Sequence, residues 1–202
     1  MNIQFWFEFG STYSYPAAMR VEALAASQGA TVAWRVFLLG PLFRAQGWND
    51  SPFNLYPAKG QYMWRDLERI CQRLQLTLKR PSVFPRTGLL ASRVACQFSE
   101  AAWLPGFVRE VYRANFEDDL DIAAPSTVAR CLVRVGQNPA EIISAAQLPA
   151  AKEQLRAQTQ EAARRGIFGA PSVVVGRELF WGNDRLEEAL SWSAGPPAPP
   201  RR

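Results

Sequence analysis

The chain has 202 residues, of which 48% are hydrophobic and 20% charged, a composition typical of one soluble globular domain. The net charge is +5, but no run of basic residues exceeds two, so no nucleic-acid-binding stripe is indicated. The sequence contains no histidine, which excludes a Ser-His-Asp triad, a Cys-His pair and every His-ligated metal site.

The three cysteines, Cys71, Cys96 and Cys131, are widely spaced and each lies in an apolar helical pattern. They form neither a C-x-x-C pair nor a zinc spacing, so we expect three buried thiols, no metal and a reducing compartment. The first residues lack a basic region and carry Glu8 within an apolar run, unlike a signal peptide. No stretch approaches the roughly 18 apolar residues of a membrane span. The sequence therefore predicts a cytoplasmic protein.

The first apolar run alternates with period two, which predicts a strand with Phe5, Phe7 and Phe9 on one face and Trp6 on the other. A helix is predicted next, from the segment SYPAAMRVEALAASQGA, with Gly29 as its stop. Thr31–Leu39 then predicts a second strand. A strand, a helix and a strand of these lengths form a βαβ unit, whose two strands are parallel.

The middle of the chain is helical in character. Residues 40–60 contain three prolines and predict a loop. From residue 61 to about 166 only helical periodicity is found. The predicted helices are Tyr62–Leu76, Gly88–Ala101, Pro105–Phe116, Ser126–Val135, Pro139–Ala146 and Ala150–Arg165.

Strand character returns near the C-terminus. The segments APSVVVG and RELFW predict two short strands, and NDRLEEALSWSA predicts a final helix. Asp184 and Glu187 fit a D-x-x-E variant of the capping box at the start of that helix. Residues 193–202 form a proline-rich tail that is predicted to be disordered.

Both ends of the chain must contribute to one sheet, because an isolated two-stranded hairpin is only marginally stable. The sequence therefore predicts an α/β fold in which residues 1–40 and 167–192 form one domain. Residues 41–166, a loop followed by helices, are inserted between its βαβ and ββα halves.

Ser11 and Ser14 lie three residues apart at the start of the first predicted helix, the spacing that redox proteins use for C-x-x-C. A helix that begins there directs free N–H groups and a positive partial charge at its N-terminus, which stabilises a thiolate. Since this segment has no sulfur, the Ser11 hydroxyl would point at the sulfur of a ligand. The alternative is that Ser11 or Ser14 only caps the helix, which is a common role.

Two further segments have both a functional and a structural interpretation. Ala170-Pro171 either begins an ordinary edge strand or contains a cis proline that turns the Ala170 backbone toward a bound peptide. The sequence does not reveal the isomer. Asn183 and Asp184 either hold the charged end of a ligand or simply start the last helix.

Together these segments resemble a known family. The order of elements is similar to the thioredoxin fold with the helical insertion of the DsbA-like superfamily. More narrowly, FGSTYSY, PAKGQYMWRDLER, RGIFGAPSVVVG and ELFWGNDRLEE resemble the 2-hydroxychromene-2-carboxylate isomerases and the related kappa-class glutathione transferases. The resemblance extends over residues 2–190.

The resemblance implies glutathione as the cofactor. Ser11 would contact the glutathione sulfur and is the implied catalytic residue. The backbone of Ala170 would pair with the glutathione peptide. The γ-glutamyl end would bind a segment made of Trp181, Gly182, Asn183 and Asp184.

The resemblance also implies a substrate pocket. Arg44 stands where many members have a lysine that meets the substrate carboxylate, and arginine keeps the charge. Asn54 and Phe84 fall in regions that line the pocket. Asn49 would take the place of a family asparagine, although Asp50 is an alternative.

The implied function is the isomerisation of 2-hydroxychromene-2-carboxylate to trans-o-hydroxybenzylidenepyruvate, or of a similar intermediate of aromatic hydrocarbon catabolism, with glutathione thiolate as a recycled nucleophile. No general base of near-neutral pKa is required if glutathione arrives as thiolate. The alternatives are a kappa-class-like glutathione transferase and a redox-inactive, thioredoxin-like peptide-binding module. Relatives imply a homodimer, with no membrane or nucleic-acid partner.

Overall fold

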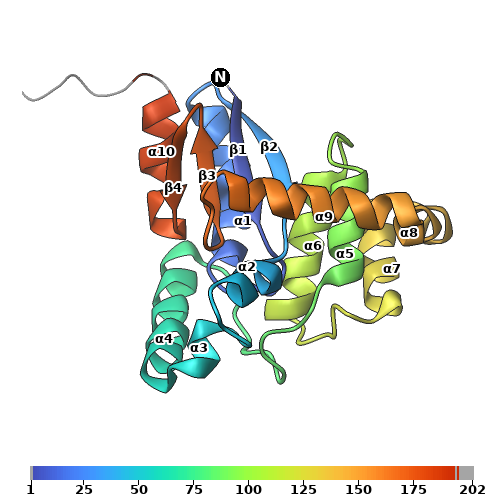
Figure 1. Ribbon diagram of the computed structural model, residues 1–202, viewed down its shortest axis with the longest axis horizontal. Helices are drawn as coiled ribbons and strands as arrows, with labels where there is room; N and C mark the ends of the chain where they lie inside the picture. Colours follow the sequence, from blue (N-terminus) through green and yellow to red (C-terminus); the bar gives the residue numbers. More distant parts are fainter. Residues whose placement is uncertain (1, 194, 196–202) are drawn as a thin grey trace, which may run out of the picture.

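The computed structural model describes residues 2–193 and 195, which contain one four-stranded sheet (Figure 1). The strand order is β2-β1-β3-β4. β1 is parallel to β2 and antiparallel to β3, and β3 pairs antiparallel with β4. The strands are β1 (Asn2–Phe7), β2 (Thr31–Val36), β3 (Ser172–Val175) and β4 (Glu178–Trp181). Both ends of the chain thus share one sheet, as predicted.

Helices fill the sequence between β2 and β3, which confirms the thioredoxin-like fold with a helical insertion. The helices are α1 (Ser14–Ser27), α2 (Leu39–Ala45), α3 (Pro52–Leu55), α4 (Pro57–Leu74), α5 (Leu89–Gln97), α6 (Leu104–Phe116), α7 (Pro125–Arg134), α8 (Pro139–Gln147), α9 (Pro149–Arg164) and α10 (Leu186–Ser193). The division into a domain of residues 1–40 and 167–192 and an insertion of residues 41–166 stays a prediction.

The loop predicted over residues 40–60 is wrong, because α2, α3 and the start of α4 lie there. Pro52 and Pro57 read as helix breakers, yet each is the first residue of a helix. At that position the missing N–H needs no partner and the fixed φ suits the helix. β2 also ends at Val36, earlier than predicted, since Leu39 already begins α2.

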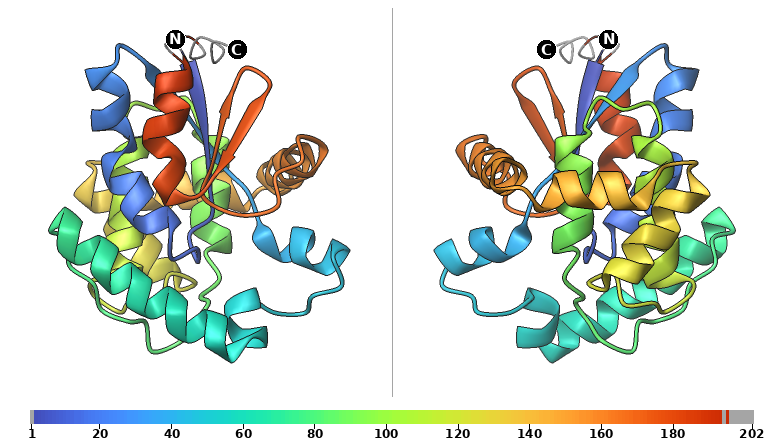
Figure 2. Two further views of the ribbon diagram at one scale, coloured as in Figure 1. Left: turned by 90° about the vertical axis from the view of Figure 1, so that its left-hand side faces the viewer. Right: turned by 90° about the vertical axis from the view of Figure 1, so that its right-hand side faces the viewer.

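The sheet is covered on both faces, which the period-two pattern of β1 did not indicate. Phe5 and Phe7 belong to the main core. Trp6, on the opposite face, is only 2% exposed and belongs to a second cluster with Phe37 and with Ala162 of α9. Figure 2 shows α9 on one side of the sheet and α1 and α10 on the other. β1 is therefore buried on both faces, as central strands of α/β sheets are.

The entry to α10 also differs from the prediction. A 3₁₀ turn, Asn183–Arg185, precedes the helix and begins after Gly182, whose φ is 121° and whose position has no side-chain cap. The capping box predicted at Asp184 and Glu187 is wrong, because Glu187 forms an ion pair with Arg20 of α1 instead.

The three cysteines are buried and free, as predicted. Of the tail predicted at residues 193–202, only Ser193, the last residue of α10, and Gly195 are described, so that prediction lies largely outside the described residues.

Candidate active site

A cleft of about 1340 Å³ lies between one end of the sheet and the helices α2 to α4. One wall comes from the sheet and the turns at its end, and the other comes from the helical insertion. Its lining falls in residues 8–13, 38–53, 59–73, 84–89, 168–170 and 181–185.

Ser11 lies in this cleft, just before α1. Its Oγ donates a hydrogen bond to the Ala170 carbonyl oxygen at 2.9 Å and accepts the N–H of Ser14 at 3.3 Å. Ser14 is fully buried and does not line the cleft. The two serines therefore have different surroundings, and only Ser11 can reach a ligand.

Ala170 stands beside Ser11, and the Ala170–Pro171 peptide bond is cis. The sequence left the isomer open. Within the described residues, the backbone N–H of Ala170 has no hydrogen-bond partner. The backbone at Ala170, just before β3, can therefore pair with an extended peptide in the cleft.

Trp181 forms an exposed apolar surface at the cleft. Its side chain is 53% exposed, and its ring packs on Phe168 with centroids 4.9 Å apart. A Cβ at Gly169 would lie 2.4 Å from the Trp181 Nε1, so glycine is needed for this packing. Gly182 follows in the lining and turns the chain away from the strand.

Asn183 and Asp184 both line the cleft but differ in what they can offer a ligand. Asn183 is 4% exposed, and its Oδ1 accepts hydrogen bonds from Arg20 Nε at 3.3 Å and Nη2 at 3.2 Å. Asp184 is exposed and has only a weak ion pair, at 3.8 Å, with Arg185. Asp184 thus presents an exposed carboxylate to the cleft, whereas the side-chain oxygen of Asn183 is already bonded to Arg20.

Of the residues predicted to meet the substrate, Arg44 and Phe84 line the cleft. Arg44 is exposed on α2 and has no ion pair within the described part of the chain. Asn49 and Asn54 lie outside the lining. The Asn54 Nδ2 donates to the Phe84 carbonyl oxygen at 3.1 Å and to both Asp50 carboxylate oxygens at 3.2 and 3.1 Å. The pocket roles of Asn49 and Asn54 stay predictions that no lining contact supports.

Glu8 was not predicted as a site residue, yet it lines the cleft at the end of β1. Its Oε2 accepts the N–H of Gly10 at 2.9 Å. Burial raises the pKa of the Glu8 carboxyl to about 7, against hydrogen bonds from the backbone of Gly10 and Ser11 that lower it. The available signal was an acidic residue inside an aromatic strand, three positions before Ser11.

The positively charged side chains that α4 contributes to the cleft were also not predicted from the sequence. Lys59, Arg69 and Arg73 line the cleft, together with Asp66, which accepts a hydrogen bond from the Tyr13 hydroxyl at 2.9 Å. Arg69 and Arg73 have no ion pair among the described residues. This side of the cleft therefore suits an anionic ligand.

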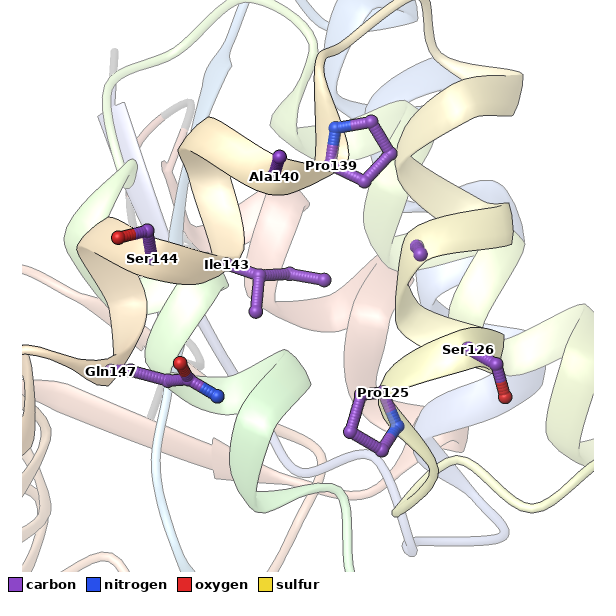
Figure 3. Close-up of a pocket in the computed structure, with 8 residues that line it drawn as sticks. Pro125, Ser126, Pro139, Ala140, Ile143, Ser144 and Gln147 are labelled. Atoms are coloured by element: carbon purple, nitrogen blue, oxygen red, sulfur yellow. The ribbon is translucent and has the colours of Figure 1, made fainter.

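A second hollow, of about 420 Å³, lies between α7 and α8, far from Ser11 in the chain (Figure 3). Its lining includes no charged side chain and only small polar groups such as Ser126, Ser144 and Gln147. It offers nothing for a charged peptide, so the cleft at Ser11 is the candidate site.

Within residues 2–193 no group of three or more His, Cys, Asp or Glu side chains could hold a metal ion. In the same part of the chain, no helix is long and apolar enough to cross a membrane.

Comparison with protein families matches the DSBA-like thioredoxin domain over residues 2–191. The chain is 28% identical over 188 residues to a 2-hydroxychromene-2-carboxylate isomerase of Sphingobium xenophagum, covering 92% of this chain and 94% of the relative. It is 29% identical to the Pseudomonas putida enzyme of that name, covering 92% and 91%. Human glutathione S-transferase kappa 1 is 26% identical over 152 residues, covering 68% and 67%. The resemblance read from the sequence is confirmed.

Solved structures agree. A 2-hydroxychromene-2-carboxylate isomerase superposes with a TM-score of 0.81 at 27% identity, covering 95% of this chain and 94% of that one. The cytosolic disulfide reductase DsbM of Pseudomonas aeruginosa, solved with GSH, superposes with a TM-score of 0.65, covering 96% of each chain. At 14% identity, that likeness shows the fold alone.

The raised pKa of Glu8 predicts a pH dependence of stability. The folded protein binds the Glu8 proton more tightly than the unfolded chain, whose carboxyl keeps the ordinary value of 4.5. The stability from this proton is full below pH 4.5 and is lost as the pH rises to about 7, at most about 3 kcal/mol. Glu8→Gln should therefore gain stability relative to the wild type between pH 4.5 and pH 8, measured by urea unfolding.

The exposed Glu68, which pairs with Arg65 on α4 outside the cleft, provides the matched control. Glu68→Gln should track the wild type at every pH. An equal response of both variants would contradict the environment described for Glu8.

Proposed function

Since the chain belongs to the DsbA-like thioredoxin family, we propose that it is a glutathione-dependent isomerase of 2-hydroxychromene-2-carboxylate, or of a similar aromatic-degradation intermediate. The observation that carries the proposal is the Ser11 hydroxyl in the cleft, before the N-terminus of α1 and beside the Ala170 backbone. The described lining contains no cysteine, so reactive sulfur has to come from a ligand. Similarity to two enzymes named as this isomerase, over 92% of the chain, supports the choice of reaction.

We infer that glutathione binds along the sheet wall of the cleft. Ser11 would exchange its hydrogen bond to the Ala170 carbonyl for one to sulfur, which holds the sulfur as thiolate with help from the positive end of α1. The free Ala170 N–H would pair with the glutathione backbone. The Asp184 carboxylate would receive the ammonium of the γ-glutamyl end, with Trp181 covering the ligand.

The substrate carboxylate would face the insertion wall, where Arg44 is the proposed partner. Phe43, Trp48, Phe53 and Phe84 also line this wall and would pack against the aromatic ring. Bound between these walls, glutathione would supply the sulfur nucleophile that adds to the substrate, permits rotation about a carbon–carbon bond and leaves unchanged. Arg44 would hold the substrate while Ser11 keeps the sulfur ionised.

A kappa-class-like transferase is the second candidate, which the 26% identity to the human kappa enzyme favours. Cytoplasmic location and homodimeric assembly stay predictions. The redox-inactive peptide-binding module remains the non-enzymatic alternative, because the unpaired N–H of Ala170 can pair with an extended peptide that is not glutathione.

An assay with 2-hydroxychromene-2-carboxylate and counted free thiol separates these functions. We expect turnover that requires glutathione and leaves its concentration unchanged, because the thiolate is regenerated when the product leaves. Loss of thiol in step with substrate would support the transferase. Absence of both turnover and glutathione binding by calorimetry would leave the peptide-binding module.

Ser11→Ala should lower kcat at saturating glutathione by about 100-fold, the usual cost of losing one hydrogen-bond donor to a catalytic anion. Affinity for glutathione should fall much less, since the other contacts remain. Ser126→Ala, on the exposed start of α7, is the matched control and should leave kcat unchanged. Equal kcat values for the Ser11 variant and the wild type would refute the role given to Ser11.

Arg44→Met should raise KM for the substrate by about 10-fold or more, because a charge-assisted hydrogen bond to the carboxylate is lost. The Kd for glutathione should not change. Steady-state kinetics and calorimetry test the two parts separately, with Arg156→Met on the exposed surface of α9 as the control. A parallel loss of glutathione affinity would place Arg44 in the glutathione site instead.

A further inference from the structure

Among the carboxyl groups of the cleft that have no role in the proposed function, Glu8 lies nearest to Ser11 in the chain. Glu8 follows the last residue of β1, and the backbone closes tightly from there to Ser11, whose N–H donates to the Glu8 carbonyl oxygen at 3.1 Å. In the same turn the Glu8 side chain bends back, and its Oε2 accepts the N–H of Gly10 at 2.9 Å. The Glu8 carboxyl and the Ser11 hydroxyl thus belong to one fixed turn and line one cleft.

Gly10 allows this arrangement. A Cβ on Gly10 would lie 2.7 Å from the Arg86 carbonyl oxygen and 3.2 Å from the Glu8 Oε2. Only glycine lets the turn pack against the Arg86 backbone while the carboxylate stays folded under it. The position of the Glu8 carboxyl is therefore set by the packing of two segments that are far apart in the sequence.

Within the described part of the chain, the backbone N–H groups of Gly10 and Ser11 favour the ionised form of Glu8, but no side chain bonds to its carboxylate. The Tyr112 hydroxyl, on α6, donates its hydrogen bond to the Glu8 backbone carbonyl oxygen at 2.9 Å and not to the Glu8 carboxylate. The Arg86 guanidinium is directed at Asp119 and at Asn115 Oδ1, which is 3.2 Å away. Among the described residues no cation lies within ion-pair distance of the Glu8 carboxylate. Burial therefore dominates and raises the pKa of Glu8 to about 7.

We propose that Glu8 is the proton acceptor for the thiol of bound glutathione. This rests on the proposed function and adds a catalytic residue to it. The S–H bond breaks, its proton forms an O–H bond on the Glu8 carboxylate, and the electron pair remains on sulfur. One negative charge moves from Glu8 to the thiolate beside Ser11 and α1, so the net charge of the site does not change. The proton returns to sulfur when glutathione leaves.

The two groups are matched for this transfer. An ordinary thiol has a pKa of about 8.5 and the ordinary value for Glu8 is 4.5, so a solvent-exposed glutamate would rarely accept the thiol proton. The raised pKa of Glu8 removes most of that difference. The pKa difference that remains would be removed by the Ser11 hydrogen bond and the N-terminus of α1, because both favour the thiolate and so lower the pKa of the bound thiol. Glutathione then need not arrive ionised.

The test is the number of protons released when glutathione binds at pH 8, where Glu8 is ionised beforehand. Calorimetry in two buffers of different ionisation enthalpy gives that number, and absorbance near 240 nm reports the thiolate. We expect the wild type to form thiolate and release close to no protons. The new thiolate is a like charge beside Glu8, so it raises the pKa of the Glu8 carboxyl further and the thiol proton remains there. Glu8→Gln should release about one proton per thiolate formed, or form no thiolate.

The side-chain amide in the Glu8→Gln variant still has an oxygen that can accept the Gly10 N–H. A second variant, Glu8→Asp, keeps a carboxyl and should restore the low proton release if that carboxyl stays in place. Glu68→Gln should behave as the wild type. Thiolate formation with about one proton released in both the wild type and Glu8→Gln would overturn the role of Glu8 and leave the isomerase intact. Failure of the wild type to bind glutathione would overturn the proposed function and, with it, this role.

Discussion

The hydrogen bond from the Ser11 hydroxyl to the Ala170 carbonyl joins the two ends of the chain at the cleft. It depends on the sheet, because β1 lies between β2 and β3 and runs antiparallel to β3. The end of β1 therefore lies beside the beginning of β3, with Trp6 opposite Ser172. The turn from Glu8 to Ser11 follows β1, and the Ala170 backbone, with which a peptide can pair, precedes β3. This junction would not exist if the strands were parallel.

The helical insertion completes the site by fixing α4 against the same turn. The Thr12 Oγ1 donates to the Met63 Sδ at 2.8 Å, and the Tyr13 hydroxyl donates to the Asp66 carboxylate at 2.9 Å. Burial and this bond to Asp66 raise the pKa of Tyr13 well above its ordinary value, so Tyr13 stays a donor. The cationic side of α4 thus forms one wall of the cleft, and Ser11 and the Ala170 backbone belong to the other.

Replacing sulfur by hydroxyl changes what this fold can do. Ser11 cannot form a disulfide, and burial raises the pKa of the thiols of Cys71, Cys96 and Cys131 to about 11 each. The chain therefore offers no thiolate of its own near neutral pH. Under the proposed function, the cleft would bind the thiolate of a ligand instead, with Ser11 as its hydrogen-bond donor and Glu8 as the acceptor of its proton. In that proposal the chain needs no histidine, because the Glu8 carboxyl and the ligand thiol would exchange the proton between them.

Local patterns in the sequence determined the strands, most helices and the pairing of both chain ends in one sheet, because periodicity and turn residues act over a few positions. They also indicated Ser11, which stands next to its helix in the chain. Only tertiary structure decided that Pro52 starts a helix and that α9 buries Trp6. Tertiary structure also brings Arg20 into a hydrogen bond with the Asn183 side chain and places Glu8 in the wall of the cleft. Desolvation and hydrogen bonding arise from neighbours distant in sequence, so no local pattern contains them.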